Sequence, residues 1–268
     1  MVQKYIVKEN NRKLLLFFAG WACDETPFKD YRPHNMDYMI CYDYRTLEFD
    51  YSIFEVYEQV NVVAWSMGVW AGGYILNHAP NYKGLTIAYN GSTIPIHNDE
   101  GIPVTVFEST LQNLTPSTLQ KFLRRMCGNA QAYKAFMQIT PPRDFDEIKE
   151  ELQSIKERYC QETGFLWNEK GILTHNPEEE ENEDKFDTYC DNFCWSYDLA
   201  FIGENDAIFP VENLCISMEN NHIYSYNNSP HYDAEIFQII LEDMWKMTYD
   251  EFFIYLNDLE CPNSYTMN

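Results

Sequence analysis

The sequence predicts an α/β fold, a mostly parallel β-sheet with helices on both faces and an inserted helical segment. Residues 13–19 form a continuous apolar run, typical of a central strand in a sheet that is covered on both sides. Strand-like and helix-like stretches alternate up to residue 88 and resume from residue 197. Residues 61–73 indicate a buried strand that runs directly into a helix, with one serine at the corner.

The remaining elements follow in chain order. Apolar or β-branched runs predict strands at residues 5–7, 13–19, 38–42, 61–65, 85–88, 197–202 and 222–226. Helical patterns are expected at residues 52–59, from the serine corner to about residue 78, and at residues 234–256.

The serine at the corner is Ser66, in the sequence Ala64-Trp65-Ser66-Met67-Gly68. A serine in a tight turn between a strand and a helix is the nucleophile elbow of the α/β-hydrolase fold. The usual pattern is G-x-S-x-G, and here Ala64 replaces the first glycine. The alternative is that Ser66 only caps the helix that follows.

A nucleophilic serine needs a base, and the base needs a carboxylate to orient it. In the α/β-hydrolase topology the three residues follow in the chain order Ser, acid, His. Asp206 lies in a loop just after one predicted strand, and His231 lies just after the next. The sequence therefore predicts a Ser66–Asp206–His231 triad, although Asp206 could cap a turn and His231 could be a structural histidine.

The oxyanion hole is expected to consist of backbone N–H groups. The residue after the nucleophile supplies one donor, which is Met67, and the loop after an early strand supplies another. That loop contains Gly20 and Trp21, so we expect the second donor to be the amide of Trp21. The Trp21 side chain can also form a wall of the pocket.

The pattern changes after Asn90-Gly91-Ser92 and Ile102-Pro103, which are turn signals. Residues 109–195 read as helical or irregular, too long for a simple crossover, so we expect an inserted helical cap. The α/β-hydrolase core would then comprise residues 1–108 and 196–268. The acidic run Glu178–Glu181 is expected to be a solvated loop.

Composition excludes several classes of function. The formal net charge of −23 opposes binding to nucleic acid and to anionic membrane surfaces. The N-terminus has no apolar signal region and the chain no apolar run long enough to span a membrane, so we expect a cytoplasmic protein. The eight cysteines lack C-x-x-C spacing and are expected to be free thiols. A zinc site on Cys190 and Cys194 is the alternative, but we expect no metal and no cofactor.

Several segments of the chain resemble the BioG-type pimeloyl-[acyl-carrier protein] methyl ester esterases. The resemblance spans most of the chain and is carried by residues 17–21, 64–68, 90–95, 101–103, 121–122 and 124–128. It implies an α/β-hydrolase that cleaves the methyl ester of pimeloyl bound to acyl carrier protein and so closes the pimelate stage of biotin synthesis. It also implies that Ser66 is the nucleophile, His231 the general base and acid, and Asp206 its orienting partner. Ala22 replaces the second glycine of a Gly-Trp-Gly motif, which bears on the oxyanion geometry.

The expected cap also carries a basic segment. Residues 109–143 contain no Asp or Glu, in a chain that is otherwise strongly acidic. Spacings of three and four residues place Lys121, Arg124 and Arg125 on one face of a helix. Such a patch could bind an acidic carrier protein and the phosphate of its phosphopantetheine arm. Alternatively, these cations neutralise acidic surface nearby.

The sequence leaves two rival functions open. The first is an esterase or thioesterase that acts on a free small acyl ester, and it differs from the carrier-dependent enzyme in not needing Arg124 and Arg125. The second is a non-catalytic binding protein with a hydrolase fold, against which the complete set of Ser, Asp and His argues.

Overall fold

The computed structural model describes the chain except residues 80–81, 164, 168–172, 176–194, 220 and 260–268. At its centre is a seven-stranded sheet in the order β1-β3-β2-β4-β5-β8-β9. β1 is antiparallel to β3, and the other pairings in this sheet are parallel. The predicted mostly parallel sheet is therefore confirmed.

The strands of this sheet are β1 (Val2–Val7), β2 (Lys13–Phe18), β3 (Asp37–Tyr42), β4 (Gln59–Trp65), β5 (Thr86–Tyr89), β8 (Leu199–Gly203) and β9 (His222–Tyr226). A separate antiparallel pair consists of β6 (Phe165–Trp167) and β7 (Leu173–His175). The helices are α1 (Ile53–Val56), α2 (Met67–Asn77), α3 (Val104–Gln112), α4 (Pro116–Met126), α5 (Ala130–Phe136), α6 (Phe145–Thr163), α8 (Val211–Ser217), α9 (Ala234–Leu241), the 3-10 helix η1 (Asp243–Lys246) and α10 (Tyr249–Asp258).

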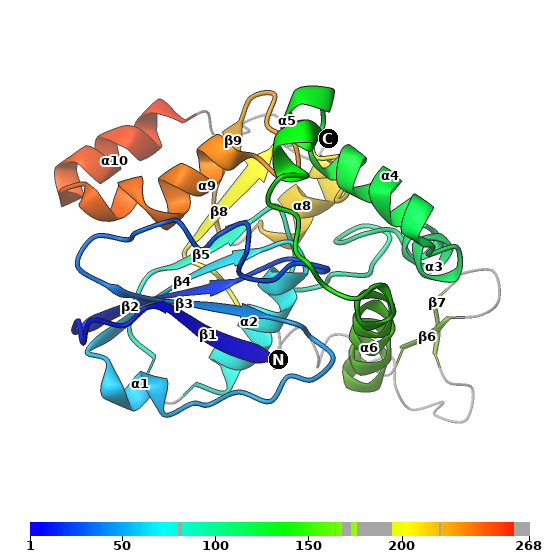
Figure 1. Ribbon diagram of the computed structural model, residues 1–268, viewed down its shortest axis with the longest axis horizontal. Helices are drawn as coiled ribbons and strands as arrows, with labels where there is room; N and C mark the ends of the chain where they lie inside the picture. The colour runs from blue at the N-terminus through cyan, green and yellow to red at the C-terminus, as the bar shows by residue number, and fades with distance from the viewer. Residues whose placement is uncertain (80–81, 164, 168–172, 176–194, 220, 260–268) are drawn as a thin grey trace.

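The central strands are buried on both faces. In β2 every residue from Leu14 to Phe18 is buried, and in β4 the same holds from Val60 to Trp65. Helices α1 and α2 lie on one side of the sheet, and α9 and α10 lie on the other (Figure 1). This double cover explains why the sequence of β2 is a continuous apolar run without alternation.

The parallel register aligns the carboxyl ends of the central strands at one edge. Phe18 of β2 pairs with Ala64 of β4, and Ala64 pairs with Ala88 of β5. The loops that follow these strands therefore meet at this edge, where ligand sites of open α/β sheets form.

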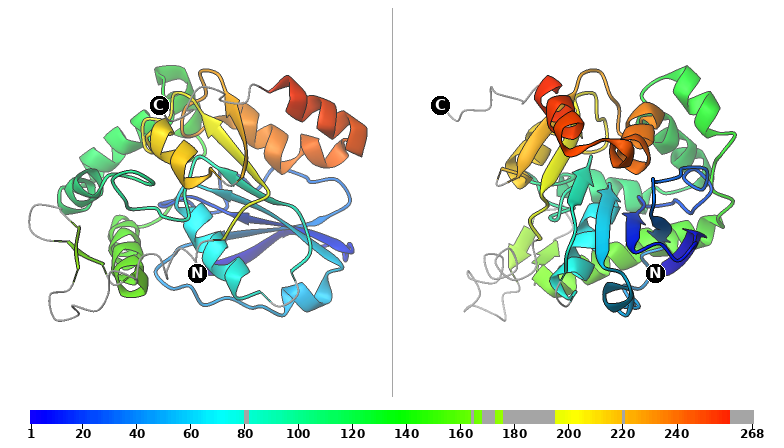
Figure 2. Two further views of the ribbon diagram at one scale, coloured as in Figure 1. Left: turned by 180° about the vertical axis from the view of Figure 1, so that it is seen from behind. Right: turned by 90° about the vertical axis from the view of Figure 1, so that its left-hand side faces the viewer.

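Helices α3 to α6 (residues 104–163), which follow β5 and precede β8, gather at one end of the sheet, away from α10 (Figure 2). We call them the cap helices. The division of the chain at residues 109 and 195 stays a prediction, and the first of these helices begins at Val104. The sequence did not predict β6 and β7, and the acidic run Glu178–Glu181 lies outside the described residues.

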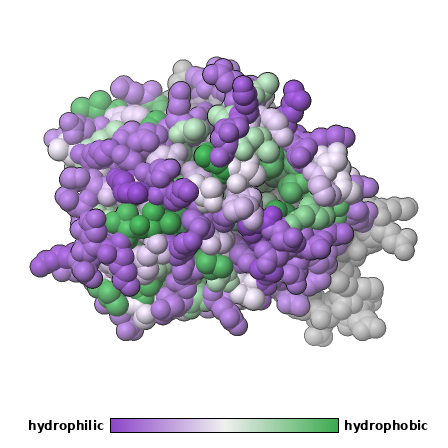
Figure 3. All heavy atoms as spheres, in the orientation of Figure 1, coloured by the Kyte–Doolittle hydropathy of each residue, from purple (hydrophilic) through white to green (hydrophobic). Residues whose placement is uncertain are grey.

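Two surface properties complete the description. On the face drawn in Figure 3, hydrophilic residues separate the hydrophobic ones into distinct groups. Among the described residues, no helix combines the length and the apolar character needed to cross a membrane.

Candidate active site

Ser66 lies at the corner between β4 and α2 with φ of 58° and ψ of −130°, a conformation that L-residues rarely adopt. Close packing around the corner requires small residues. A Cβ atom on Gly68 would lie 2.3 Å from the Phe18 carbonyl oxygen, and one on Gly91 would lie 2.3 Å from the Ser66 carbonyl oxygen. The local geometry is therefore that of the predicted elbow.

The structure brings the three predicted triad residues together. His231 Nε2 is 2.9 Å from Ser66 Oγ, and His231 Nδ1 is 2.7 Å from Asp206 Oδ2. Asp206 follows β8 and His231 follows β9, at adjacent parallel strands of the sheet. The side chains of Asp206 and His231 are almost completely buried, so water competes little for these hydrogen bonds.

Backbone N–H groups that directly follow Asp206 in its loop hold its carboxylate in place. Its second carboxylate oxygen, Oδ1, accepts hydrogen bonds from the N–H groups of Ile208 at 2.7 Å and Phe209 at 3.0 Å. With Oδ1 occupied, Oδ2 faces the imidazole N–H of His231. This arrangement fixes one tautomer of His231, with the lone pair of Nε2 directed at the serine hydroxyl.

Two residues that the sequence did not assign to the site position the His231 loop. The indole N–H of Trp65 donates to the His231 carbonyl oxygen at 2.9 Å. The side-chain amide of Asn90 donates to the carbonyl oxygens of Pro230 and His231, both at 3.1 Å, and its oxygen accepts from Gly203 N–H at 2.7 Å. Asn90 thus links the ends of β5 and β8 to the base. Asn90 has a left-handed conformation (φ 44°). Its position directly after a predicted strand, at the start of the turn signal Asn90-Gly91-Ser92, is the sequence signal that could have found it.

Trp21 and Met67 both border the cavity that contains Ser66 and His231. The Trp21 indole donates to the Ile148 carbonyl oxygen at 2.8 Å and packs edge-on against the Phe122 ring, with centroids 5.1 Å apart. The side chain is therefore a wall of the pocket, as one of the two expected roles requires. The oxyanion role of the two amides stays a prediction.

This cavity has a volume of about 30 Å³. That space suffices for about one water molecule. Its remaining lining is mostly apolar and comes from the end of β4, the segment before α3, the cap helices and the loop after β8: Trp65, Ile102, Val106, Phe107, Thr110, Phe122, Arg125, Met126, Leu152 and Ile208. The polarity of this lining, apolar around one hydroxyl and one imidazole, matches that of an acyl chain, whereas the enclosed space itself is smaller than an acyl chain.

A second hollow of about 230 Å³ adjoins the cavity on the surface of the cap helices. Lys121 and Arg125 line it, and Thr110, Phe122 and Arg125 border both spaces. Arg124 is exposed on the same helix, α4. The predicted cations therefore flank a hollow next to the triad, whereas their binding role remains a prediction.

No group of three or more His, Cys, Asp or Glu in the described part of the chain could hold a metal ion. Cys190 and Cys194, the alternative zinc ligands, lie outside the described residues. The described cysteines are free thiols, and burial raises the pKa of Cys127 to about 12.

The sheet, the elbow and the order of the three residues define an α/β-hydrolase fold, and this class is confirmed by solved structures. Residues 1–164, more than half of the 268-residue chain, match the sequence model of the family described as "Pimeloyl-ACP methyl esterase BioG". The protein belongs to this family.

Two curated relatives are similar in sequence. A protein of Bacteroides fragilis (strain 638R) named "Malonyl-[acyl-carrier protein] O-methyltransferase" is 41% identical over 229 residues, which cover 84% of this chain and 40% of that protein. An uncharacterized protein of Haemophilus influenzae is 40% identical over 143 residues, 53% of this chain and 65% of that protein. The chain thus matches less than two thirds of either relative.

Solved structures agree on the fold. The crystal structure of BioG from Haemophilus influenzae superposes with a TM-score of 0.72 and 28% identity, covering 91% of this chain and 100% of that one. An esterase from Exiguobacterium antarcticum (TM-score 0.53, 12% identity, 85% and 87% covered) and MenH from S. aureus (0.52, 11%, 89% and 95%) share the fold alone.

Proposed function

We propose that the protein is a serine carboxylesterase that hydrolyses the methyl ester of pimeloyl-[acyl-carrier protein], a step of biotin synthesis. The observation that carries this proposal is the hydrogen-bonded chain Asp206–His231–Ser66 beside an apolar cavity, in a member of the BioG family. Membership of the family supports the substrate, and the site supports the reaction.

In the proposed first half-reaction, Ser66 Oγ attacks the ester carbonyl carbon while His231 Nε2 takes the hydroxyl proton. The imidazolium that forms is stabilised by Asp206, and the tetrahedral oxyanion is stabilised by the amides of Trp21 and Met67. When the carbon–oxygen bond of the ester breaks, His231 returns the proton to the leaving oxygen and methanol departs. The product is an acyl-enzyme on Ser66.

In the second half-reaction, water attacks the acyl-enzyme, with His231 as the general base. The second tetrahedral intermediate collapses, His231 returns the proton to Ser66, and the free acid leaves. The carboxylate product is charged, so an apolar cavity favours its release over its retention. Neither half-reaction calls for a metal or a cofactor.

The acyl carrier protein is proposed to dock on the cap helices. α4 exposes Lys121, Arg124 and Arg125 on a segment without acidic residues, while the chain as a whole carries a net charge of −23. An acidic partner would be repelled elsewhere and attracted here. The adjoining hollow would lead the substrate arm from these cations toward Ser66.

Two other candidates remain to be tested. An esterase for free small esters would use the same triad without the cations. The second candidate is a methyltransferase, because one relative has that name. The match covers only 40% of that relative, so its name does not determine the activity of the matched part. The Ser–His–Asp arrangement favours hydrolysis over methyl transfer, because ester hydrolysis proceeds through attack by an activated serine.

The decisive experiment measures release of free acid and methanol from methyl pimeloyl-acyl carrier protein, beside a short-chain p-nitrophenyl ester. We expect turnover by the wild type and by Ser117→Ala, an exposed serine on α4, but not by Ser66→Ala with unchanged circular dichroism. Activity retained in Ser66→Ala would remove the triad. Turnover of the small ester alone would discard the carrier-bound substrate.

A further inference from the structure

A buried ion pair lies outside the triad. Arg143 Nη1 is 2.6 Å from Glu151 Oε2, and the side chains are 7% and 0% exposed. Glu151 belongs to the cap helix α6, and Arg143 precedes that helix. Burying two charges is costly unless further hydrogen bonds satisfy them. The contacts of the pair therefore indicate what it holds.

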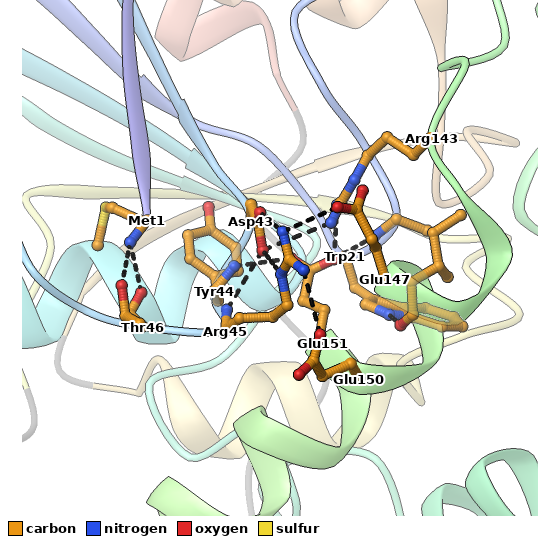
Figure 4. A network of polar contacts seen from close by, with 12 residues as sticks. Met1, Trp21, Asp43, Tyr44, Arg45, Thr46, Arg143, Glu147, Glu150 and Glu151 are labelled. Carbon is orange, nitrogen blue, oxygen red and sulfur yellow. Dashed lines mark hydrogen bonds and ion pairs between the residues drawn. The ribbon is translucent and has the colours of Figure 1, made fainter.

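Both residues of the pair form hydrogen bonds with the backbone of the loop that follows β2 (Figure 4). Glu151 Oε2 accepts the Ala22 N–H at 3.3 Å, and Glu151 Oε1 accepts the Tyr44 N–H at 2.9 Å. Arg143 Nη1 also donates to the Cys23 carbonyl oxygen at 3.1 Å. Two consecutive residues of the loop, Ala22 and Cys23, are thus bound by one ion pair from the cap side.

This loop is a tight turn with an unfavourable residue. The Cys23 N–H donates to the Gly20 carbonyl oxygen at 3.3 Å, which closes a four-residue turn. Ala22, its third residue, has φ of 65°, a value that type II turns require and that favours glycine. Ala22 stands where the related Gly-Trp-Gly motif has glycine, so the strained conformation needs support from outside the turn.

The turn determines where the Trp21 amide points. The Gly20 carbonyl faces into the turn, because it accepts the Cys23 N–H. The N–H of the same trans peptide, which belongs to Trp21, therefore faces outward. The Glu151 bond fixes the next peptide plane, between Trp21 and Ala22, and the indole bond to Ile148 fixes the side chain.

We propose that Glu151, held by Arg143, is a positioning residue that orients the Trp21 amide toward the oxyanion. This inference rests on the proposed function, in which that amide is an oxyanion donor. It makes α6 part of the catalytic geometry, because one carboxylate of the cap sets the turn beside Ser66. The adjacent carboxylate Glu150 bonds Arg45 instead and has no contact with the turn among the described residues.

The test compares Glu151→Gln with Glu150→Gln on a short-chain p-nitrophenyl ester. Losing an oxyanion donor lowers turnover by about a hundred- to a thousandfold. Since the donor is misoriented rather than lost, we expect kcat of Glu151→Gln to fall about ten- to a hundredfold, with KM within about twofold. The inhibition constant of a trifluoromethyl ketone, which forms a tetrahedral oxyanion adduct, should rise by the same factor. Glu150→Gln should match the wild type.

Two further variants separate positioning from stability. Replacing both charges, in Arg143→Met/Glu151→Met, leaves no unpaired buried charge but removes the acceptor of the Ala22 and Tyr44 N–H groups. We therefore expect kcat to fall in molecules that circular dichroism at 25 °C shows to be folded, whatever the change in melting temperature. Adding Ala22→Gly to Glu151→Gln relieves the strained turn and should restore part of kcat. A Glu151→Gln enzyme with wild-type kcat and inhibition constant overturns the inference. So does a fall in kcat that Ala22→Gly leaves unrelieved.

The controls distinguish this inference from the proposed function. Labelling of Ser66 by a fluorophosphonate and hydrolysis by the wild type establish the esterase independently of Glu151. If the wild type hydrolyses neither ester, the esterase and the inference fail together. If it hydrolyses esters and Glu151→Gln is indistinguishable from it, only the inference fails.

Discussion

Ser66 adopts a backbone conformation that costs about 1–3 kcal/mol for an L-residue. The surrounding residues over-determine it, since Gly68 and Gly91 pack against neighbouring carbonyl oxygens at distances that exclude a side chain. The strain places the hydroxyl within hydrogen-bond reach of His231 Nε2. The strained backbone of Ser66 therefore destabilises the fold locally but places the hydroxyl where His231 can accept its proton.

The orientation of His231 depends on the charge of Asp206. In Asp206→Asn the amide group would either leave the N–H groups of Ile208 and Phe209 without an acceptor or present a donor to His231 Nδ1. We expect kcat on a small ester to fall about 10⁴-fold because the wrong tautomer is favoured, with little change in KM. Steady-state kinetics tests this.

The matched control is Asp233→Asn. Asp233 caps α9 two residues after His231, and its oxygen accepts the Glu235 N–H at 3.0 Å. Asparagine caps helices about as well as aspartate, so activity should be unchanged. Equal activity in wild type and Asp206→Asn would mean that the 2.7 Å contact with His231 does not orient the base.

At the scale of elements, α4 presents opposite faces to the core and to solvent. Leu123 and Met126 are buried, whereas Lys121, Arg124 and Arg125 are exposed. A capping box of Thr115 and Thr118 starts the helix, and the two arginines in its last turn interact favourably with the helix dipole. The cations therefore have a structural benefit of their own.

Charge reversal separates the two roles of these arginines. In Arg124→Glu/Arg125→Glu we expect KM for the carrier-bound ester to rise about tenfold or more, because an acidic partner would meet repulsion. KM for a small ester should change much less, because of the two arginines only Arg125 borders the cavity around Ser66. Kinetics on both substrates is the measurement. Lys149→Glu, an exposed cation on α6, is the control. Equal effects of the arginine variant on both substrates would remove the docking site.

Glu162 near the end of α6 provides a pH-dependent test. Burial raises the pKa of this carboxyl to about 7, although Arg158 lowers it in opposition. In the unfolded chain the carboxyl ionises near 4.5. Between these values the folded state retains a proton that the unfolded state has lost, so stability falls as the pH rises from about 4.5 to 7.

We therefore expect Glu162→Gln to be more stabilising at pH 8 than at pH 5. The difference should be about 1–2 kcal/mol after allowance for partial exposure. Urea unfolding at the two pH values measures it. Glu157→Gln, an exposed position on the same helix, should show no such difference, and an equal gain at both pH values would contradict the assignment.

At the scale of the whole molecule, the formal charge of −23 makes the folded chain repel itself. Raising NaCl from about 20 to about 200 mM shortens the Debye length from roughly 20 to roughly 7 Å. We expect the melting temperature to rise by about 2–4 °C, equivalent to about 1 kcal/mol. Calorimetry measures the melting temperature at the two NaCl concentrations. Sucrose at equal osmolarity is the control, because it adds solute without screening charge. A lower melting temperature in salt would show that screened ion pairs outweigh the repulsion.

The core and the triad could be predicted because each depends on a pattern of residues within a short segment of the sequence. Continuous apolar strands predict the sheet, and Asp206 and His231 stand directly after such strands. Residues that act across long separations could not be predicted. Glu151 contacts Ala22 over 129 positions, and it lies in a charged helix whose sequence resembles a solvated surface. The predicted helix at residues 234–256 is divided into α9, η1 and α10, because Glu242 leaves helical geometry.

The order of strands in the sheet has a consequence for biosynthesis. The chain emerges with the nucleophile directly after β4, but its base arrives 165 positions later, beyond β8 and β9. At about 5–20 residues per second the ribosome needs roughly ten to thirty seconds to close this gap. Until β8 emerges, the outer edge of β5 has no neighbour and can pair with another chain. Catalytic competence should therefore be the last property that a nascent or refolding molecule acquires.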